Sequence, residues 1–163
     1  MIKSILIKWK LNKAAIRFKN NDLESAQKIY EEILDSHPNN FNALLWLGSI
    51  HSEKMQFPKA FELLNKAISI NPHRYEPYYN LGLMKAELNR HDEAIQTWQK
   101  AIEITNIPKI KKAELFYNIS RTLIDLKDYG VSIDYANKAL ALKPNYIEAE
   151  ENKMYAFHMI NRQ

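Results

Sequence analysis

Histidines and glycines are the residues of this chain whose side chains or backbones could serve metal binding, proton transfer or phosphate binding. The five histidines are His37, His51, His73, His91 and His158. No two of them are four residues apart, and none belongs to a recognisable catalytic triad or zinc-protease pattern. The glycines are isolated from one another, so they cannot form a glycine-rich phosphate loop. The chain also lacks cysteine, which excludes thiol nucleophiles and thiolate metal sites. We therefore expect no enzyme activity, no cofactor and no metal.

The elements that position the remaining polar residues recur at a fixed interval. One series of small residues and one series of large residues each repeat every 34 positions: Ala26, Ala60 and Ala94, and Tyr30, Leu64 and Trp98. A period of this length is typical of stacked repeats, because each unit is a helix pair that cannot bury its apolar face alone. The spacing predicts consecutive helical hairpins.

The second unit shows most clearly which family the repeats resemble. Residues 41–74 contain Leu47, Gly48, Ala60, Ala67 and Pro72 at the positions of the tetratricopeptide repeat pattern, and the resemblance extends over about residues 11–146. It departs from the pattern at residue 51, a histidine where the repeat has an aromatic residue. The resemblance implies an all-α fold, a right-handed α-solenoid of about four hairpins and a C-terminal capping helix, with the first helices of the hairpins lining a concave groove. It implies no enzyme activity.

We expect one domain over residues 1–163, divided by the repeat pattern. Repeat 1 spans about residues 7–40 and is degenerate, repeat 2 spans 41–74, repeat 3 spans 75–108, repeat 4 spans 113–146, and the capping helix spans 147–160. The extra residues 109–112 are expected in the connection between two hairpins, where insertions cost little. Repeat 1 fits the pattern only if its turn is one residue shorter, with Leu11, Ala14, Ala15 and Phe18 as packing positions.

The resemblance also indicates which residues face the groove. They are Asn42, Leu45, Trp46, Ser49, Glu53, Glu76, Tyr79, Asn80, Leu83, Glu87, Glu114, Tyr117, Asn118, Arg121 and Asp125. Asn80 and Asn118 occupy equivalent positions, at which an asparagine in peptide-binding members of the family hydrogen-bonds the ligand backbone, since an amide can donate and accept. The alternative is that these amides are solvated or bridge adjacent helices.

The charges and aromatic rings of this set favour some ligands over others. Five acidic groups face a single cation, Arg121, which favours a basic peptide unless the acids are simply solvated. Trp46, Tyr79 and Tyr117 are of the residue types enriched at interface hot spots, although burial between hairpins is the alternative, above all for Trp46. The family's clamp for acidic chaperone tails needs Lys and Arg at groove positions that hold Glu or Asn in this sequence, so we do not expect that ligand.

The N-terminal segment concentrates the basic charge of the chain. The net charge is +4, and residues 1–20 hold six Lys or Arg without an acid, so the remainder is slightly acidic. On a helical wheel Ile2, Ile5, Trp9 and Ile16 form one apolar stripe, and a second stripe lies opposite. Three alternatives are open for this arm: packing on the first hairpins, docking into the acidic groove of another copy through Ile2, Ile5 and Trp9, or lying on an anionic membrane surface.

These observations favour a cytoplasmic protein-interaction adaptor that binds an extended peptide or a partner helix. Its alternatives are a self-assembling scaffold, with or without peripheral membrane contact, and a chaperone that holds a client protein. The apolar run at residues 4–7 is too short for a signal peptide, and no stretch approaches the ~18 apolar residues of a membrane span. Nucleic-acid binding is not favoured, because the basic clusters are separated and lack an aromatic platform.

Overall fold

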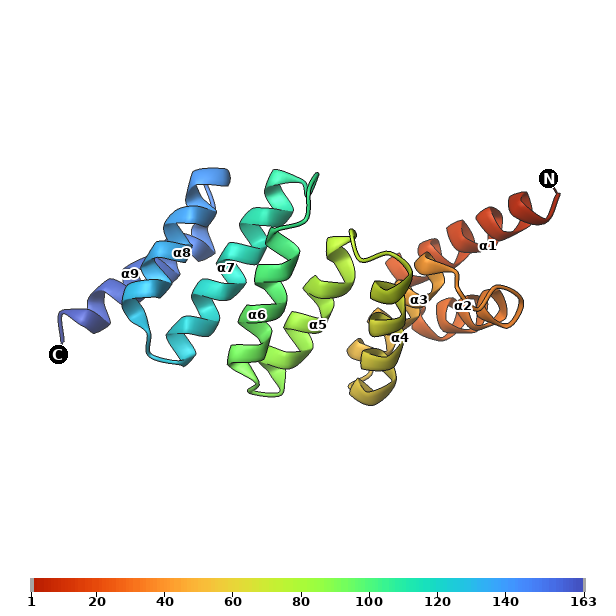
Figure 1. The fold of residues 1–163 in the computed structure, drawn as a ribbon, viewed down its shortest axis with the longest axis horizontal. Helices are drawn as coiled ribbons and strands as arrows, with labels where there is room; N and C mark the ends of the chain where they lie inside the picture. Colours follow the sequence, from red (N-terminus) through yellow and green to blue (C-terminus); the bar gives the residue numbers. More distant parts are fainter. Residues whose placement is uncertain (1, 163) are drawn as a thin grey trace. The chain divides into compact units, whose positions relative to one another are not determined.

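The fold consists of consecutive α-helices. The computed structural model describes residues 2–162, with side chains from residue 5, and every regular element in this range is an α-helix (Figure 1). The helices are α1 (Ile2–Lys19), α2 (Leu23–Ser36), α3 (Phe41–Glu53), α4 (Phe57–Ile70), α5 (Tyr75–Glu87), α6 (His91–Ile102), α7 (Lys109–Asp125), α8 (Tyr129–Leu142) and α9 (Ile147–Ile160).

The chain divides into two compact units, Met1–Asn80 and Leu81–Gln163. In the first unit α1 packs on α2, α2 on α3, and α3 on α4. In the second unit α6 packs on α7, α7 on α8, and α9 on both α7 and α8. Helices that are neighbours in the sequence are therefore neighbours in space within each unit, which confirms the predicted all-α fold of consecutive hairpins.

The turns inside the hairpins share one backbone geometry. A residue with positive φ recurs in them, namely Asn21 (59°), Met55 (56°), Asn89 (57°) and Lys127 (63°). The amide of the following residue donates to the carbonyl five positions earlier, as Gln56 N does to His51 O at 2.8 Å. This left-handed cap satisfies carbonyls at the helix end and reverses the chain over a fixed number of residues.

Repeat 1 keeps this full-length turn. Asn21 lies 34 residues before Met55 and has the same positive φ, so the prediction of a shortened turn was wrong. Ala14 is fully buried at the position equivalent to Gly48, whereas Ala15, predicted to pack, is exposed. The cap geometry fixes the length of the turn. Repeat 1 therefore departs from the repeat pattern within α1, whose apolar positions differ from those of α3.

Each hairpin is held together where a small residue meets a large one. The predicted series of alanines and of large residues are all fully buried. A methyl group on Gly82 would overlap the indole ring of Trp98, and one on Gly48 would lie 2.8 Å from Cγ of Leu64. The glycines of the first helices therefore allow the close approach that the large residues of the second helices fill.

The four extra residues before repeat 4 do not form a loop. They are the first turn of α7, which has 17 residues against 13 in α3 and in α5. Pro108 caps this helix, and its carbonyl accepts from Lys112 N at 3.0 Å. The expectation of an insertion in the connection was wrong, because four residues make about one helical turn and extend the helix in phase.

The close approach predicts that Gly82→Ala destabilises the protein. Trp98 is fully buried, so its ring cannot move away from an added methyl group without displacing its neighbours. We expect a loss of about 3 kcal/mol in the free energy of unfolding, at the upper end for overpacking. Urea unfolding followed by circular dichroism measures it.

Gly130→Ala is the matched control, since a Cβ at residue 130 of α8 would have no neighbour within 4 Å. It should leave stability unchanged or raise it by at most about 1 kcal/mol, because alanine favours the helix. Equal losses for the two variants would contradict the packing account.

Tyr30 carries a polar group that the core does not satisfy. Its side chain is fully buried, and its hydroxyl has no hydrogen-bond partner among the described residues. Burial raises the pKa of Tyr30 to about 12, because the phenolate would be poorly solvated. The folded protein therefore holds this proton more tightly than the unfolded chain does.

Tyr30→Phe should accordingly raise stability at neutral pH by about 1 kcal/mol, since it removes an unsatisfied buried donor. The wild type should lose stability as the pH rises from about 10, the ordinary pKa of tyrosine, toward 12, and the variant should lose less. Thermal melts at pH 7 and pH 11 measure both effects. Tyr135→Phe, which removes the acceptor of a 3.2 Å bond from Gln99 Nε2, should not stabilise.

Candidate functional site

The candidate ligand-facing residues lie on the first helices of the hairpins, α3, α5 and α7. On each helix they follow spacings of three or four residues and so share one face. The unit-1 surface comprises Asn42, Trp46, Ser49, Glu53, Glu76, Tyr79 and Asn80, and the unit-2 surface comprises Leu83, Glu87, Glu114, Tyr117, Asn118, Arg121 and Asp125. Leu45 and Asn118 are both buried, at 4% and 5% exposed; Leu45 is an apolar core residue and belongs to neither surface, whereas Asn118 is polar.

Asn80 bridges two helices of the unit-1 surface. Its Nδ2 donates to Ser49 Oγ at 2.7 Å, and Ser49 Oγ donates to the carbonyl of Leu45 at 3.0 Å. This amide donor is therefore engaged inside the protein, as in the bridging alternative. Trp46 is partly engaged as well, since its ring lies 5.4 Å from that of Phe18 while 38% of the residue is exposed.

Asn118 differs from its equivalent Asn80. It is 5% exposed, and its Nδ2 has no hydrogen-bond partner among the described residues. Beside it on α7, Tyr117 is half-buried with its ring 5.1 Å from that of Tyr146. The unit-2 surface thus offers a buried amide donor next to an aromatic pair.

Two of the five acids of these surfaces are paired within the protein. Glu76 binds the guanidinium of Arg74, which raises the pKa of Arg74, and Glu114 binds Lys111 Nζ at 2.8 Å. Glu53, Glu87 and Asp125 remain as exposed carboxylates. The excess of negative charge is smaller than the sequence predicts, because neighbours on the same helices or turns neutralise part of it.

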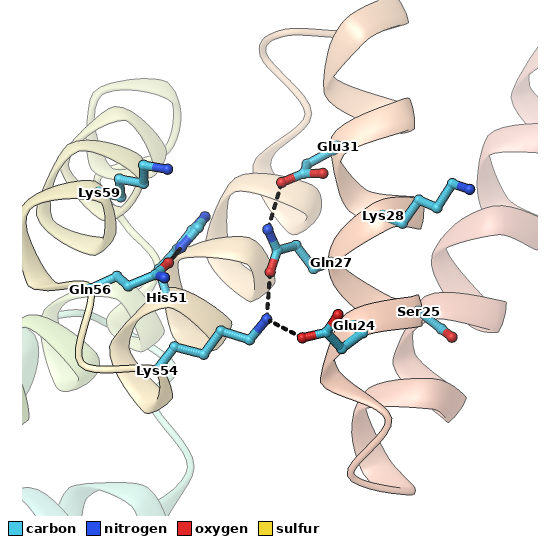
Figure 2. Close-up of a pocket in the computed structure, with 9 residues that line it drawn as sticks. All are labelled: Glu24, Ser25, Gln27, Lys28, Glu31, His51, Lys54, Gln56 and Lys59. Carbon is cyan, nitrogen blue, oxygen red and sulfur yellow. Dashed lines mark hydrogen bonds and ion pairs between the residues drawn. The ribbon is translucent and has the colours of Figure 1, made fainter.

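Unit 1 contains a polar hollow of about 600 Å³ that the sequence did not predict. It lies between α2 and the turn from α3 to α4, and Figure 2 shows Lys54 reaching across to α2. Lys54 Nζ donates to Gln27 Oε1 at 2.8 Å and to Glu24 Oε1 at 3.3 Å, and Gln27 Nε2 donates to Glu31 Oε1 at 2.8 Å. Lys54, Gln27, Glu24 and Glu31 thus form one hydrogen-bonded network, which links the two hairpins.

His51 lines the same hollow and is 5% exposed. Its Nδ1 lies 2.5 Å from Gln56 Oε1, which fixes the ring where the repeat pattern has an aromatic residue (Figure 2). The long sequence separation between Lys54 and its partners on α2 left no local signal by which the network could be found. Within residues 2–162 no three His, Asp or Glu side chains are placed to hold a metal ion, and none of the helices is both long and apolar enough to cross a membrane.

The N-terminal arm is helix α1, and it packs with one of its two apolar stripes. Ile7, Leu11 and Phe18 contact the core of unit 1. On the opposite side Ile5 is 62% exposed and Trp9 is 56% exposed. The side chain of Ile2, the remaining member of the predicted self-association set, lies outside the described residues. The arm is thus covered on one face only.

Comparisons with known proteins agree with this architecture. A family model described as anaphase-promoting complex, cyclosome, subunit 3 matches residues 19–101, and a tetratricopeptide repeat model matches residues 73–145. The DnaJ homolog subfamily C member 7 homolog of Schizosaccharomyces pombe is 24% identical over 152 residues, which are 86% of this chain and 32% of that protein. The chain spans about a third or less of the length of the curated relatives it matches.

Two solved structures share the fold. The pilF protein of Pseudomonas aeruginosa superposes with a TM-score of 0.89 at 18% identity, covering 99% of this chain and 72% of that one. YrrB, described as a TPR protein with an unusual peptide-binding site, superposes with a TM-score of 0.74 at 18% identity, covering 94% and 77%. The predicted fold class, an all-α solenoid of tetratricopeptide-type hairpins, is therefore confirmed. The subunit 3 model and the tetratricopeptide repeat model together cover residues 19–145, and the repeat positions are buried as the pattern requires, so the chain belongs to the tetratricopeptide repeat family.

Proposed function

We propose that this protein is a non-catalytic protein-interaction module that binds an extended peptide or a partner helix along the first helices of its hairpins. The observation that carries the proposal is Asn118 on α7. A buried amide donor without a partner costs free energy unless something accepts from it. The backbone carbonyl of a bound peptide would be such an acceptor once the buried side chain of Asn118 turns toward the exposed face of α7.

The neighbours of Asn118 suit a peptide. Tyr117 is half-buried and packs against the core residue Tyr146, and Arg121 and Asp125 continue along the exposed face of α7. Aromatic residues supply large contact areas at a small cost in side-chain entropy. YrrB, which shares the fold, is a peptide-binding protein by its description, and that supports the same kind of ligand.

Asn80 has a different role in this proposal. Its donor is engaged with Ser49, so binding through it would require that bond to break. We assign Asn80 to the connection between α3 and α5, and Asn118 to the ligand. Glu53, Glu87 and Asp125 outnumber Arg121 among the exposed charges of the two surfaces, which favours peptides with Lys or Arg.

Asn118→Leu tests the proposal, because leucine has a similar volume but neither donates nor accepts. Peptides selected from a displayed random library with the wild-type protein should bind the variant about tenfold more weakly, as measured by fluorescence anisotropy. Stability should stay equal or rise, since an unsatisfied donor has been removed. Weaker binding together with undiminished stability separates a ligand contact from a structural one.

Asn80→Leu is the matched control at the equivalent position, and it should lower the melting temperature by breaking the bond to Ser49. If the selected peptides bind the Asn118→Leu variant and the wild type with equal affinity, the side chain of Asn118 does not contact the ligand. Selected peptides with no excess of Lys and Arg over Asp and Glu would contradict the charge preference alone.

A further inference from the structure

The outer face of α1 is an apolar stripe bordered by cations. Ile5, Trp9 and Ile16 are 62%, 56% and 61% exposed, and a shallow hollow of about 330 Å³ borders the last two. Lys8 and Lys13 lie beside the stripe on the helical wheel, and Lys13 Nζ is 5.2 Å from the centre of the Trp9 ring. Large apolar groups clustered on one exposed face, rimmed by charge, are typical of an interaction surface.

The outer face of α9 is a second apolar stripe, bordered by anions. Ile147, Met154 and Phe157 are 69%, 61% and 60% exposed. Glu151 borders this stripe on the helical wheel, and Glu150, which pairs with Lys153 Nζ at 3.3 Å, lies within it between Met154 and Phe157; both glutamates are exposed. The opposite face of α9 is already used, since the helix packs on α7 and α8.

We infer that the outer face of α1 docks on the outer face of α9 of a second copy of this chain. The two faces are opposite in charge, because Lys8 and Lys13 border the stripe of α1, whereas Glu150 and Glu151 lie in and beside the stripe of α9. One contact would remove both apolar stripes from water and place the lysines of one helix near the glutamates of the other. This inference does not depend on the proposed peptide binding.

Two other partners for the outer face of α1 would each leave part of these observations unexplained. An anionic membrane would cover α1 but would leave the acidic and apolar face of α9 in water. Docking of α1 on the acids of the unit-1 and unit-2 surfaces would bring its cations to Glu53, Glu87 and Asp125 but would leave the apolar stripe of α9 in water. Because α1 and α9 are different surfaces, the contact is heterologous, and copies add head to tail as an open chain unless the chain closes into a ring. The expected product has no fixed size, and its mean mass rises with concentration.

Charge reversal on the two faces tests the inference with the full chain. One variant carries Lys8→Glu and Lys13→Glu, and the other carries Glu150→Lys and Glu151→Lys. All four residues are exposed, so both variants should fold, which circular dichroism checks. Sedimentation equilibrium at low salt should show association of the wild type and a monomer for each variant alone. An equimolar mixture of the two variants should associate again, since each face then meets a face of opposite charge.

Lys66→Glu combined with Lys100→Glu, two exposed sites on α4 and α6, makes the same change in net charge as the α1 variant and should associate as the wild type does. A wild type that stays monomeric up to millimolar concentration would overturn the inference, and so would a mixture that stays monomeric. If only the α1 variant loses association, α1 binds α1 or another surface and the role of α9 is wrong. If the wild type stays monomeric but sediments with vesicles of anionic lipid, the partner of α1 is a membrane surface and not a second copy.

Discussion

The closeness of the two helices in a hairpin is the constraint on which the rest of the structure depends. It is set by a small residue on the first helix and the residue that faces it on the second, as with Gly82 and Trp98 or Gly48 and Leu64. The equivalent positions hold Ala14 with Tyr30 in repeat 1 and Ser120 with Ala136 in repeat 4, and all of these are buried. In repeat 4, where the glycine is replaced by a serine, the large residue is an alanine. The two helices of repeat 4 therefore meet through small residues and a buried hydrogen bond, in which Ser132 Oγ donates to the carbonyl of Ser120 at 2.9 Å.

Repetition made much of the fold predictable from the sequence. The series at residues 26, 60 and 94 and at residues 30, 64 and 98 located the buried positions, since one packing problem recurs and each copy confirms the others. The turns were less predictable, because Met55 and Lys127 adopt positive φ without being glycine or asparagine. In these positions the helix cap imposes the conformation and outweighs the cost for the side chain, roughly 1–2 kcal/mol per residue. The same rule fixed the turn of repeat 1, where a sequence pattern judged by side chains alone suggested a shorter one.

The sequence predicted which positions of the first helices carry the candidate residues, but not which of these side chains are hydrogen-bonded within the protein. Asn80 and Asn118 are equivalent in the repeat, yet one amide has a partner and the other does not. The difference depends on the neighbouring helix: Ser49 on α3 is within reach of Asn80, and the described part of the chain offers no such acceptor to Asn118. Whether a side chain is engaged depends on the contacts of a second helix, which residue spacing along one helix does not encode. For the same reason the network of Lys54 with α2 left no pattern in either segment.

The helices α1 and α9 differ from the interior helices in the number of neighbours on which they pack. An interior helix of a hairpin stack has neighbours on both sides, whereas α1 and α9 have described neighbours on one side only. A helix face that stays in water is ordinarily lined by polar residues. Here both outer faces remain apolar, and the charges at their borders are basic on α1 and acidic on α9. Contact with solvent alone explains neither the large apolar side chains on these faces nor the opposite charges beside them. A contact between the two faces explains both features.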